Sequence, residues 1–329
     1  LDFSEPKFND VEVKTFHGYC KKLLKSGLGF SAYYYPYLPK LLEKDAQLLG
    51  FDYSVDEFNR KIAKLEENAP AFEFYINRAD YYNAVGHSDS VYRVYKYYLN
   101  NPSRIPKYDL IIADEYQDFN KLESFLIALL GSKNHTLIAG DDDQAIYGFR
   151  ASSTEYIRDL YADNNYEKFN LPYSSRCTDV LVNTINDFIK TVQDHGYLED
   201  RIDAKEYTSY WPDKYLYSEK YATIPISKCT TEACAQKFVI ERIKNITREE
   251  NITGTEKDLQ FLVIGAETQH RLDRLAEKLK EELNETTYEI ITSSDADEVP
   301  GSIKYGYYLL HNDDKDNLGW RIVLENDPP

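Results

Sequence analysis

The sequence predicts an α/β fold built on parallel sheets, and three consecutive segments carry that prediction. Residues 108–114 (YDLIIAD) form a continuous apolar run, as in a strand that is buried on both faces of a sheet. Residues 122–131 (LESFLIALLG) follow with helical spacing, and residues 135–141 (HTLIAGD) form a second apolar strand. Strand, helix and strand in this order are typical of a parallel α/β unit.

Two segments precede this unit. Residues 11–20 (VEVKTFHGYC) open with alternating apolar and polar side chains, which predicts a short strand that runs into a helix beginning near Gly18. Residues 31–101 carry apolar side chains mostly at three- and four-residue spacing. We expect this stretch to form a small helical insertion.

The segments after the unit predict a helix at 152–161 and a turn that leads into a long helix within 171–193. Residues 197–222 are rich in Tyr, Asp and Pro and show little periodicity, so we expect a surface excursion.

A second α/β half begins near residue 225. It is predicted to contain a helix at 233–246, a buried strand at 259–265, a helix at 268–283 and a helical end at 306–326.

The simplest division of the chain places a boundary near residue 168. The first domain would span 1–168, with the helical insertion at about 31–101, and the second would span 169–329.

Composition limits the function classes. The chain has 329 residues, 42% of them hydrophobic, and no apolar run near the ~20 residues that span a bilayer, so a cytoplasmic protein without a membrane partner is expected. The net charge of −17 excludes a surface that is basic all round, so any nucleic acid must bind in a local groove. Cys229 and Cys234 lack a matching pair of ligands for zinc, and we expect the four cysteines to be reduced structural thiols.

Acidic side chains follow both strands of the parallel unit. In open parallel sheets, ligands gather at the carboxyl ends of the strands. Asp114 suits Mg²⁺, which prefers oxygen ligands and keeps several waters, and Glu115 can take a proton from an attacking water. Gln144 follows three aspartates after the next strand and can donate to a phosphate or accept from a water. The alternative is a solvated acidic loop.

Four motifs together resemble the UvrD/Rep-like branch of superfamily 1 DNA helicases. They are DEYQDFN (114–120), GDDDQAIYGFRAS (140–152), TFHGYC (15–20) and LPYSSRCTDVLVNTIN (171–186). The two central motifs are specific in combination, whereas TFH alone is weak. Residues 262–279 and 306–326 are similar to parts of the family's second motor domain.

The resemblance implies two RecA-like parallel-sheet domains of the P-loop NTPase type, both incomplete in this chain. It implies ATP and Mg²⁺ as cofactors and single-stranded or partly duplex DNA as the partner. The implied activity is that of an ATP-dependent single-stranded DNA translocase or helicase.

Carried over position by position, the family's motifs imply a catalytic set. Asp114 would bind Mg²⁺, Glu115 would activate water, Gln144 would sense the γ-phosphate, and Arg176 would contact it. Ser175 stands where the family has a Tyr that stacks on adenine, and Tyr173, two residues earlier, is the candidate for that contact.

The same resemblance implies a path for single-stranded DNA. Its residues would be Thr15, Phe16, His17, Tyr147, Phe149 and Arg150. Aromatic faces stack on any base, which suits a translocase that does not read sequence. The alternatives are core packing for the aromatic residues and capping of a strand end for the histidine.

The chain also departs from the family. It contains no GxxxxGK[ST] phosphate loop, and the family's late TxHxxKGLE and VAxTRA motifs are absent. Without the phosphate cradle we expect this chain alone to be inactive. We interpret it as a central fragment of a helicase. An attached domain or a protein partner beyond the termini is a further possibility. The alternatives are a catalytically degenerate module that binds DNA or a protein partner without ATP turnover, and a two-domain nucleotide-binding enzyme such as a kinase or ligase.

Overall fold

The structure is a computed structural model, and it describes most but not all of the chain. The described residues are 11–26, 32–145, 152–171, 173–198, 200–202, 205, 207–209, 219, 223–224, 227–249, 269–283 and 303–326. Within this part of the chain, no helix is both long and apolar enough to cross a bilayer.

The chain divides into two compact units. The first contains residues 1–174, 183–208 and 300–329, and the second contains 175–182 and 209–299. The final thirty residues thus fold with the first unit, although the sequence partition at residue 168 groups them with the second half. The division into motor domains at 1–168 and 169–329 stays a prediction.

Four helices confirm the helical insertion predicted before the parallel unit. They are α2 (Leu38–Leu49), α3 (Val55–Ala63), α4 (Pro70–Tyr81) and α5 (His87–Asn100), followed by the short η2 (Pro102–Arg104). Local chemistry sets their ends: Ser54 accepts a hydrogen bond from the Glu57 N–H at the start of α3, and Gly50 ends α2 with a φ of 65°.

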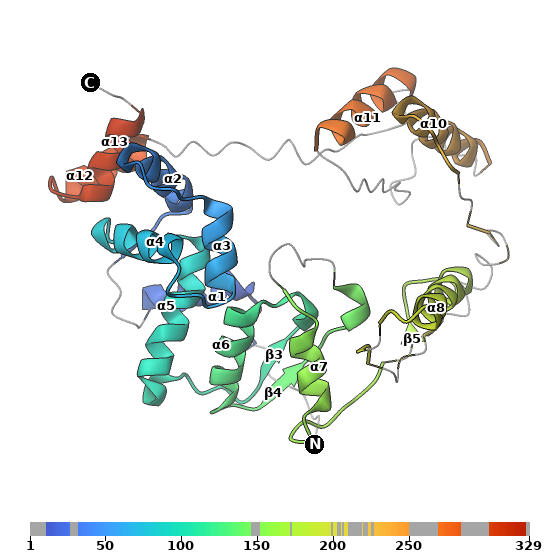
Figure 1. Ribbon diagram of the computed structural model, residues 1–329, viewed down its shortest axis with the longest axis horizontal. Helices are drawn as coiled ribbons and strands as arrows, with labels where there is room; N and C mark the ends of the chain where they lie inside the picture. Colours follow the sequence, from blue (N-terminus) through green and yellow to red (C-terminus); the bar gives the residue numbers. More distant parts are fainter. Residues whose placement is uncertain are drawn as a thin grey trace. The chain divides into compact units, whose positions relative to one another are not determined.

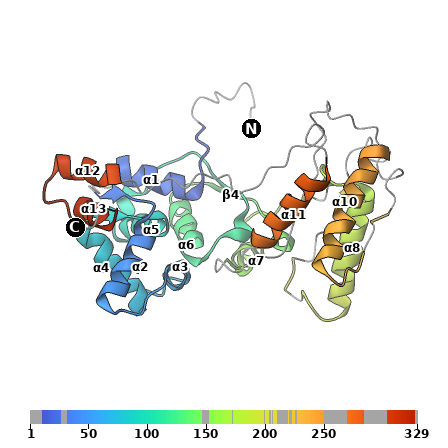
Figure 2. The ribbon, with the colours of Figure 1, turned by 90° about the horizontal axis from the view of Figure 1, so that it is seen from above.

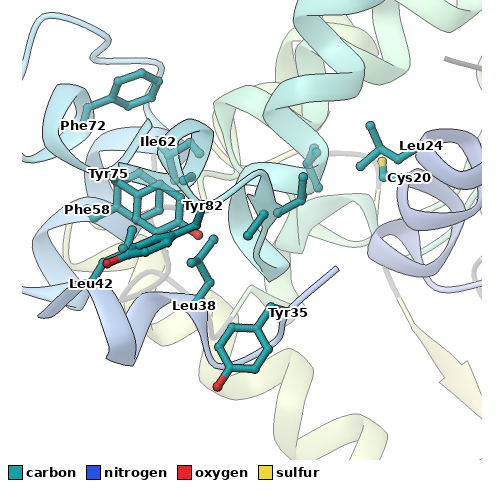
Figure 3. Close-up of a cluster of buried hydrophobic side chains, with 14 of the residues drawn as sticks. Cys20, Leu24, Tyr35, Leu38, Leu42, Phe58, Ile62, Phe72, Tyr75 and Tyr82 are labelled. Atoms are coloured by element: carbon teal, nitrogen blue, oxygen red, sulfur yellow. The ribbon is translucent and has the colours of Figure 1, made fainter. Parts of the chain in front are cut away.

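The core of this insertion is aromatic. The rings of Phe58 and Tyr75 stack with centroids 3.7 Å apart, and Leu42, Ile62 and Tyr82 lie around them (Figure 3). Stacked rings at this separation combine a large buried apolar area with a fixed geometry, which holds α3 against α4.

A short parallel pair that was not predicted joins the start of the insertion to the segment between α4 and α5. Strands β1 (Tyr33–Tyr34) and β2 (Ala84–Val85) pair in parallel. Each has only two residues, and two residues cannot display an alternating pattern in the sequence.

The predicted strand–helix–strand unit is confirmed. Strands β3 (Ile111–Ala113) and β4 (Thr136–Ile138) pair in parallel, with Ile112 opposite Leu137. Helix α6 (Lys121–Gly131) connects them, and it begins with a reciprocal cap between Asn120 and Glu123. Figure 1 shows the strand pair between α6 and α7 (Glu155–Ala162).

The predicted strand near residues 11–15 is wrong. Residues 11–15 form no strand, and α1 (Phe16–Ser26) begins before Gly18. Val11 and Val13 are 67% and 89% exposed, so their alternation buries no face, and the Thr15 hydroxyl instead accepts the Gly18 N–H at the start of the helix.

The remaining predicted helices of the middle of the chain are confirmed. Helix α7 covers most of 152–161, and α8 (Asp179–Asp194) follows the turn after residue 171. The short strands β5 (Tyr173–Ser174) and β6 (Thr208–Ser209) pair with each other.

The second compact unit contains the helices α10 (Glu232–Glu249) and α11 (Gln269–Glu282), which confirm two predicted helices. Ile240, Ile243 and Leu279 are buried between them. The predicted strand at 259–265 lies outside the described residues. The structure therefore confirms a helix-rich α/β protein with small parallel sheets, while two complete RecA-like domains stay a prediction.

The C-terminal segment forms α12 (Ile303–Asn312) and α13 (Asn317–Asn326), which lie beside α2 (Figures 1 and 2). Asp45 of α2, which is 3% exposed, accepts hydrogen bonds from Arg321 (2.7 Å) and Tyr82 (2.6 Å) and pairs with Arg78. Burial acts to raise the pKa of Asp45, but these hydrogen bonds outweigh it and hold the pKa below its usual value.

Replacement of Asp45 by Ala should lower the free energy of unfolding by about 2–3 kcal/mol, because two arginines and a tyrosine lose their shared acceptor. Urea unfolding followed by circular dichroism measures this change. The matched control is Glu66→Ala, which removes an exposed pair with Lys61 and should leave the free energy of unfolding nearly unchanged. Equal effects of the two variants would contradict the role of Asp45.

Candidate functional site

The two central motifs lie side by side because they follow paired strands. The Ala139 N–H donates to the Ala113 carbonyl (2.8 Å), which continues the β3–β4 pairing past its last residue. The Tyr116 N–H then donates to the Ala139 carbonyl (3.0 Å). The acids after β3 are thereby held next to the loop that follows β4.

Glu115 adopts an unusual backbone conformation. Its φ is 53° and its ψ is 41°, the left-handed region, which costs about 1 kcal/mol for a residue with a side chain. The turn leads directly into η3 (Tyr116–Asp118) and leaves the Glu115 side chain exposed. Strain of this kind persists where the surrounding contacts determine the conformation.

The side chain of Gln117 supplies such a contact. It is 1% exposed, its Nε2 donates to Glu115 Oε2 (2.7 Å), and its Oε1 accepts the Asp141 N–H (3.0 Å). One amide group thus joins the carboxylate after β3 to the main chain after β4. We did not single out this residue in the sequence, although it stands inside the DEYQDFN motif.

Gly140 leaves room for this bridge. A Cβ at this position would lie 2.7 Å from Gln117 Oε1, 2.6 Å from Ile157 Cδ1 and 3.1 Å from the Tyr116 nitrogen. The glycine is therefore required by the close approach of the buried amide and of the main chain.

The side chains of Asp114 and Glu115 are both exposed to solvent. Asp114 Oδ1 accepts the Glu115 N–H (3.0 Å). Hydrated Mg²⁺ binds through one or two carboxylates of this kind, so Asp114 fits the predicted metal ligand. The Glu115 carboxylate, which accepts a hydrogen bond from Gln117, follows this ligand directly in the sequence and can act as a base.

The loop after β4 forms η4 (Asp142–Gln144) and brings three carboxylates together. We call Asp141, Asp142 and Asp143 the acidic loop; their carboxylate oxygens lie within 4.8 Å of one another. Gln144 is exposed, and its Nε2 donates to Asp141 Oδ2 (2.8 Å). Arg158 of α7 pairs with Asp142 (2.8 Å).

The acidic loop contacts three residues that we call the basic segment: Arg201, Lys205 and Tyr207. Arg201 Nε lies 2.8 Å from Asp143 Oδ1, and Lys205 Nζ lies 2.7 Å from Asp141 Oδ1. The expected surface excursion over 197–222 is therefore wrong for these residues: Arg201 is 7% exposed. Composition gave no sign of them because the carboxylates that hold them are about sixty residues away.

The basic segment changes the titration of the acidic loop. Burial acts to raise the pKa of Asp141, but hydrogen bonds from Lys205, Gln144 and Tyr207 outweigh it and lower the pKa. For Asp142, the bonds from Lys205 and Arg158 likewise outweigh burial and lower the pKa. Asp141 and Asp142 are thereby held as charged carboxylates.

The predicted DNA residues at the start of α1 are only partly accessible. Thr15 is exposed, Phe16 is half-buried 5.4 Å from the ring of Phe119, and His17 is half-buried. The His17 ring stacks on His87 of α5 with centroids 3.8 Å apart. These contacts connect α1 both to the motif after β3 and to the helical insertion.

The structure does not bring all predicted site residues together. Tyr147, Phe149 and Arg150 lie outside the described residues. Tyr173 belongs to the first compact unit and is 64% exposed, whereas Arg176 is exposed in the second unit. The contacts of Gln117 and Asp141 join Glu115 to Gln144, and Asp114 directly precedes Glu115.

Fold and site together define a class: a parallel α/β unit that carries oriented carboxylates at the carboxyl ends of adjacent strands. Residues 39–165 match the UvrD/REP helicase N-terminal domain family. Over this part of its length the chain is similar to the UvrD-like superfamily 1 helicases, which confirms the resemblance seen in the motifs.

Individual relatives agree with this assignment. The chain is 29% identical over 145 residues to DNA helicase II of Haemophilus influenzae, covering 43% of the chain and 20% of the relative. It is 37% identical over 106 residues to the ATP-dependent DNA helicase PcrA of Staphylococcus aureus, covering 31% and 13%. A probable DNA helicase II homolog of Mycoplasma capricolum is 24% identical over 192 residues, covering 56% and 25%. The chain thus spans a quarter or less of these relatives.

Replacement of Gly140 by Ala should displace the Gln117 amide, because the new methyl group overlaps its Oε1, and should lower the free energy of unfolding by about 1–3 kcal/mol. Thermal and urea unfolding measure the loss. Gly131→Ala is the matched control, since its Cβ would meet only the Thr136 side chain, at 3.1 Å or more. An unchanged stability of Gly140→Ala would contradict the packing described.

Acid should weaken the contact between the acidic loop and the basic segment. The folded pKa values of Asp141 and Asp142 lie below that of an unfolded aspartate, about 3.9. Their contribution to stability is therefore complete above about pH 4 and is lost as the pH falls through the lowered values. Urea unfolding between pH 6 and 3 should show a steeper decline for the wild type than for Asp142→Asn; parallel curves would contradict the charged contact.

Proposed function

We propose that the protein is an ATP-dependent single-stranded DNA translocase that unwinds DNA, with this chain forming part of its motor. The observation that carries the proposal is the Gln117 bridge, which orients Glu115 and ties it to the loop that bears Gln144. Motifs that must act on one nucleotide are thereby held together. The similarity of residues 39–165 to the UvrD/REP helicase N-terminal domain supports the same activity.

Asp114 would hold Mg²⁺, which neutralises charge on the transferred phosphate when it is bound. Glu115 would accept the proton of the attacking water, and its exposed side chain leaves space for that water. The hydrogen bond from Gln117 restricts Glu115 to one orientation, so the base would be in place before the nucleotide arrives.

Three further residues are proposed to complete the nucleotide site. Gln144 would contact the γ-phosphate with its second amide hydrogen, while the first stays bonded to Asp141. Arg176 would stabilise charge on the same phosphate, and Tyr173 would stack on the adenine. These roles follow the motif positions, and they accompany the proposed division into two RecA-like domains at 1–168 and 169–329.

Single-stranded DNA is proposed to run over Thr15, Phe16 and His17 at the start of α1. Phe16 packs against Phe119, which directly follows the acids after β3. A movement of that motif on ATP hydrolysis would therefore reach the DNA path through one ring contact. The proposed path continues over the remaining motif residues, which are Tyr147, Phe149 and Arg150.

The test is ATP hydrolysis by the full-length protein with and without single-stranded DNA. Glu115→Gln should lower the DNA-stimulated rate by about 10²–10⁴-fold, as expected for loss of a general base. The affinity for a fluorescent ATP analogue should stay unchanged, because the amide keeps the size of the carboxylate. Glu66→Gln, on the surface of the helical insertion, is the control and should hydrolyse ATP at the wild-type rate.

The outcomes separate the alternatives. A wild-type rate for Glu115→Gln would overturn the assignment of the base. A wild-type protein that binds single-stranded DNA but hydrolyses no ATP would instead identify the degenerate binding module.

A further inference from the structure

The contact between the acidic loop and the basic segment is dense and lies within one compact unit. Arg201 makes two parallel bonds to Asp143, Nε to Oδ1 and Nη2 to Oδ2, each 2.8 Å long. Lys205 contacts all three carboxylates: Asp141 at 2.7 Å, Asp143 at 3.3 Å, and Asp142. A paired guanidinium–carboxylate geometry is both strong and directional, so this contact fixes orientation as well as charge.

The charges of the contact balance. Three carboxylates within 4.8 Å would repel one another, and such a group is a potential cation site. Arg201, Lys205 and Arg158 supply three positive charges against the three negative ones. Side-chain cations thus occupy the positions at which a metal ion would neutralise the loop.

The contact also reaches Gln144. Asp141 Oδ2 accepts two hydrogen bonds, one from Gln144 Nε2 (2.8 Å) and one from the Tyr207 hydroxyl (2.7 Å). Asp141 Oδ1 meanwhile accepts from Lys205. The basic segment therefore fixes the carboxylate that holds the Gln144 amide.

We propose that Arg201, Lys205 and Tyr207 are positioning residues that hold the acidic loop and, through Asp141, set the position of Gln144. The acidic loop is on this view a docking point for the protein's own cations rather than a metal site. The functional part of the proposal rests on the proposed role of Gln144 in ATP hydrolysis.

Lys205→Ala tests the contact directly, with Lys205→Arg as the conservative variant. The matched control is Lys237→Ala, which removes an exposed lysine of α10. The side-chain amide signals of Gln144 in ¹⁵N–¹H spectra, assigned with Gln144→Glu, report its hydrogen bond to Asp141. They should shift in Lys205→Ala, return toward the wild-type position in Lys205→Arg and stay unchanged in Lys237→Ala. Unshifted Gln144 signals in Lys205→Ala would overturn the proposal.

Manganese provides a second, independent readout. Mn²⁺ binding to the wild type and to Asp142→Asn is measured by electron paramagnetic resonance. We expect the two proteins to bind the same amount of Mn²⁺. Wild-type protein that binds Mn²⁺ in a way that Asp142→Asn abolishes would overturn the proposal, because the loop would then be a metal site.

The kinetic readout separates this proposal from the proposed function. In the full-length protein, Lys205→Ala should lower kcat for ATP about tenfold with little change in KM, since ground-state binding does not depend on the bond. Unchanged kcat beside shifted Gln144 signals would overturn the positioning role. A wild-type protein without ATP hydrolysis would overturn the proposed function alone, while the amide signals would still decide the contact.

Discussion

The hydrogen bonds of the Gln117 side chain are the constraint on which the arrangement of the site depends. A primary amide carries a donor and an acceptor on one planar group, so it can serve the Glu115 carboxylate and the Asp141 N–H simultaneously. A carboxylate in its place would repel Glu115, and an apolar side chain would leave both partners unpaired. The left-handed turn at Glu115 and the missing side chain at Gly140 are consistent with this single requirement.

The acidic character of the chain is organised locally. The net charge is −17, and part of the negative charge is neutralised inside the fold, at Asp45 and at the acidic loop. Each of these sites gathers cations from segments far along the chain. Their carboxylates thereby hold together segments that are far apart in the sequence.

Local patterns predicted the regular elements, and long-range contacts escaped prediction. Residues 108–141 revealed strand, helix and strand because apolar period and length are visible in a short window. The alternation at Val11 and Val13 misled, since nothing in the sequence tells whether an alternating face meets a partner. The roles of Arg201 and Lys205 were not predicted, because their acceptors lie about sixty residues away. An ion pair between such distant residues produces no periodic pattern in the sequence.

The site shows the same division. Asp114, Glu115 and Gln144 were predicted from their motifs, and the paired strands bring them to one edge of the sheet. The sequence shows that residue 117 is a glutamine, but it does not show what its amide binds. The two partners of the amide come together only when β3 and β4 pair.

The bond between Asp45 and Arg321 joins positions 276 residues apart. Closing a long loop costs conformational entropy, so contacts between distant segments are expected to form late in folding. During synthesis, α2 is therefore made long before its final partner leaves the ribosome. Until then Asp45 has Arg78 and Tyr82 among its described partners, and α13 supplies the last of the described hydrogen bonds to this buried carboxylate.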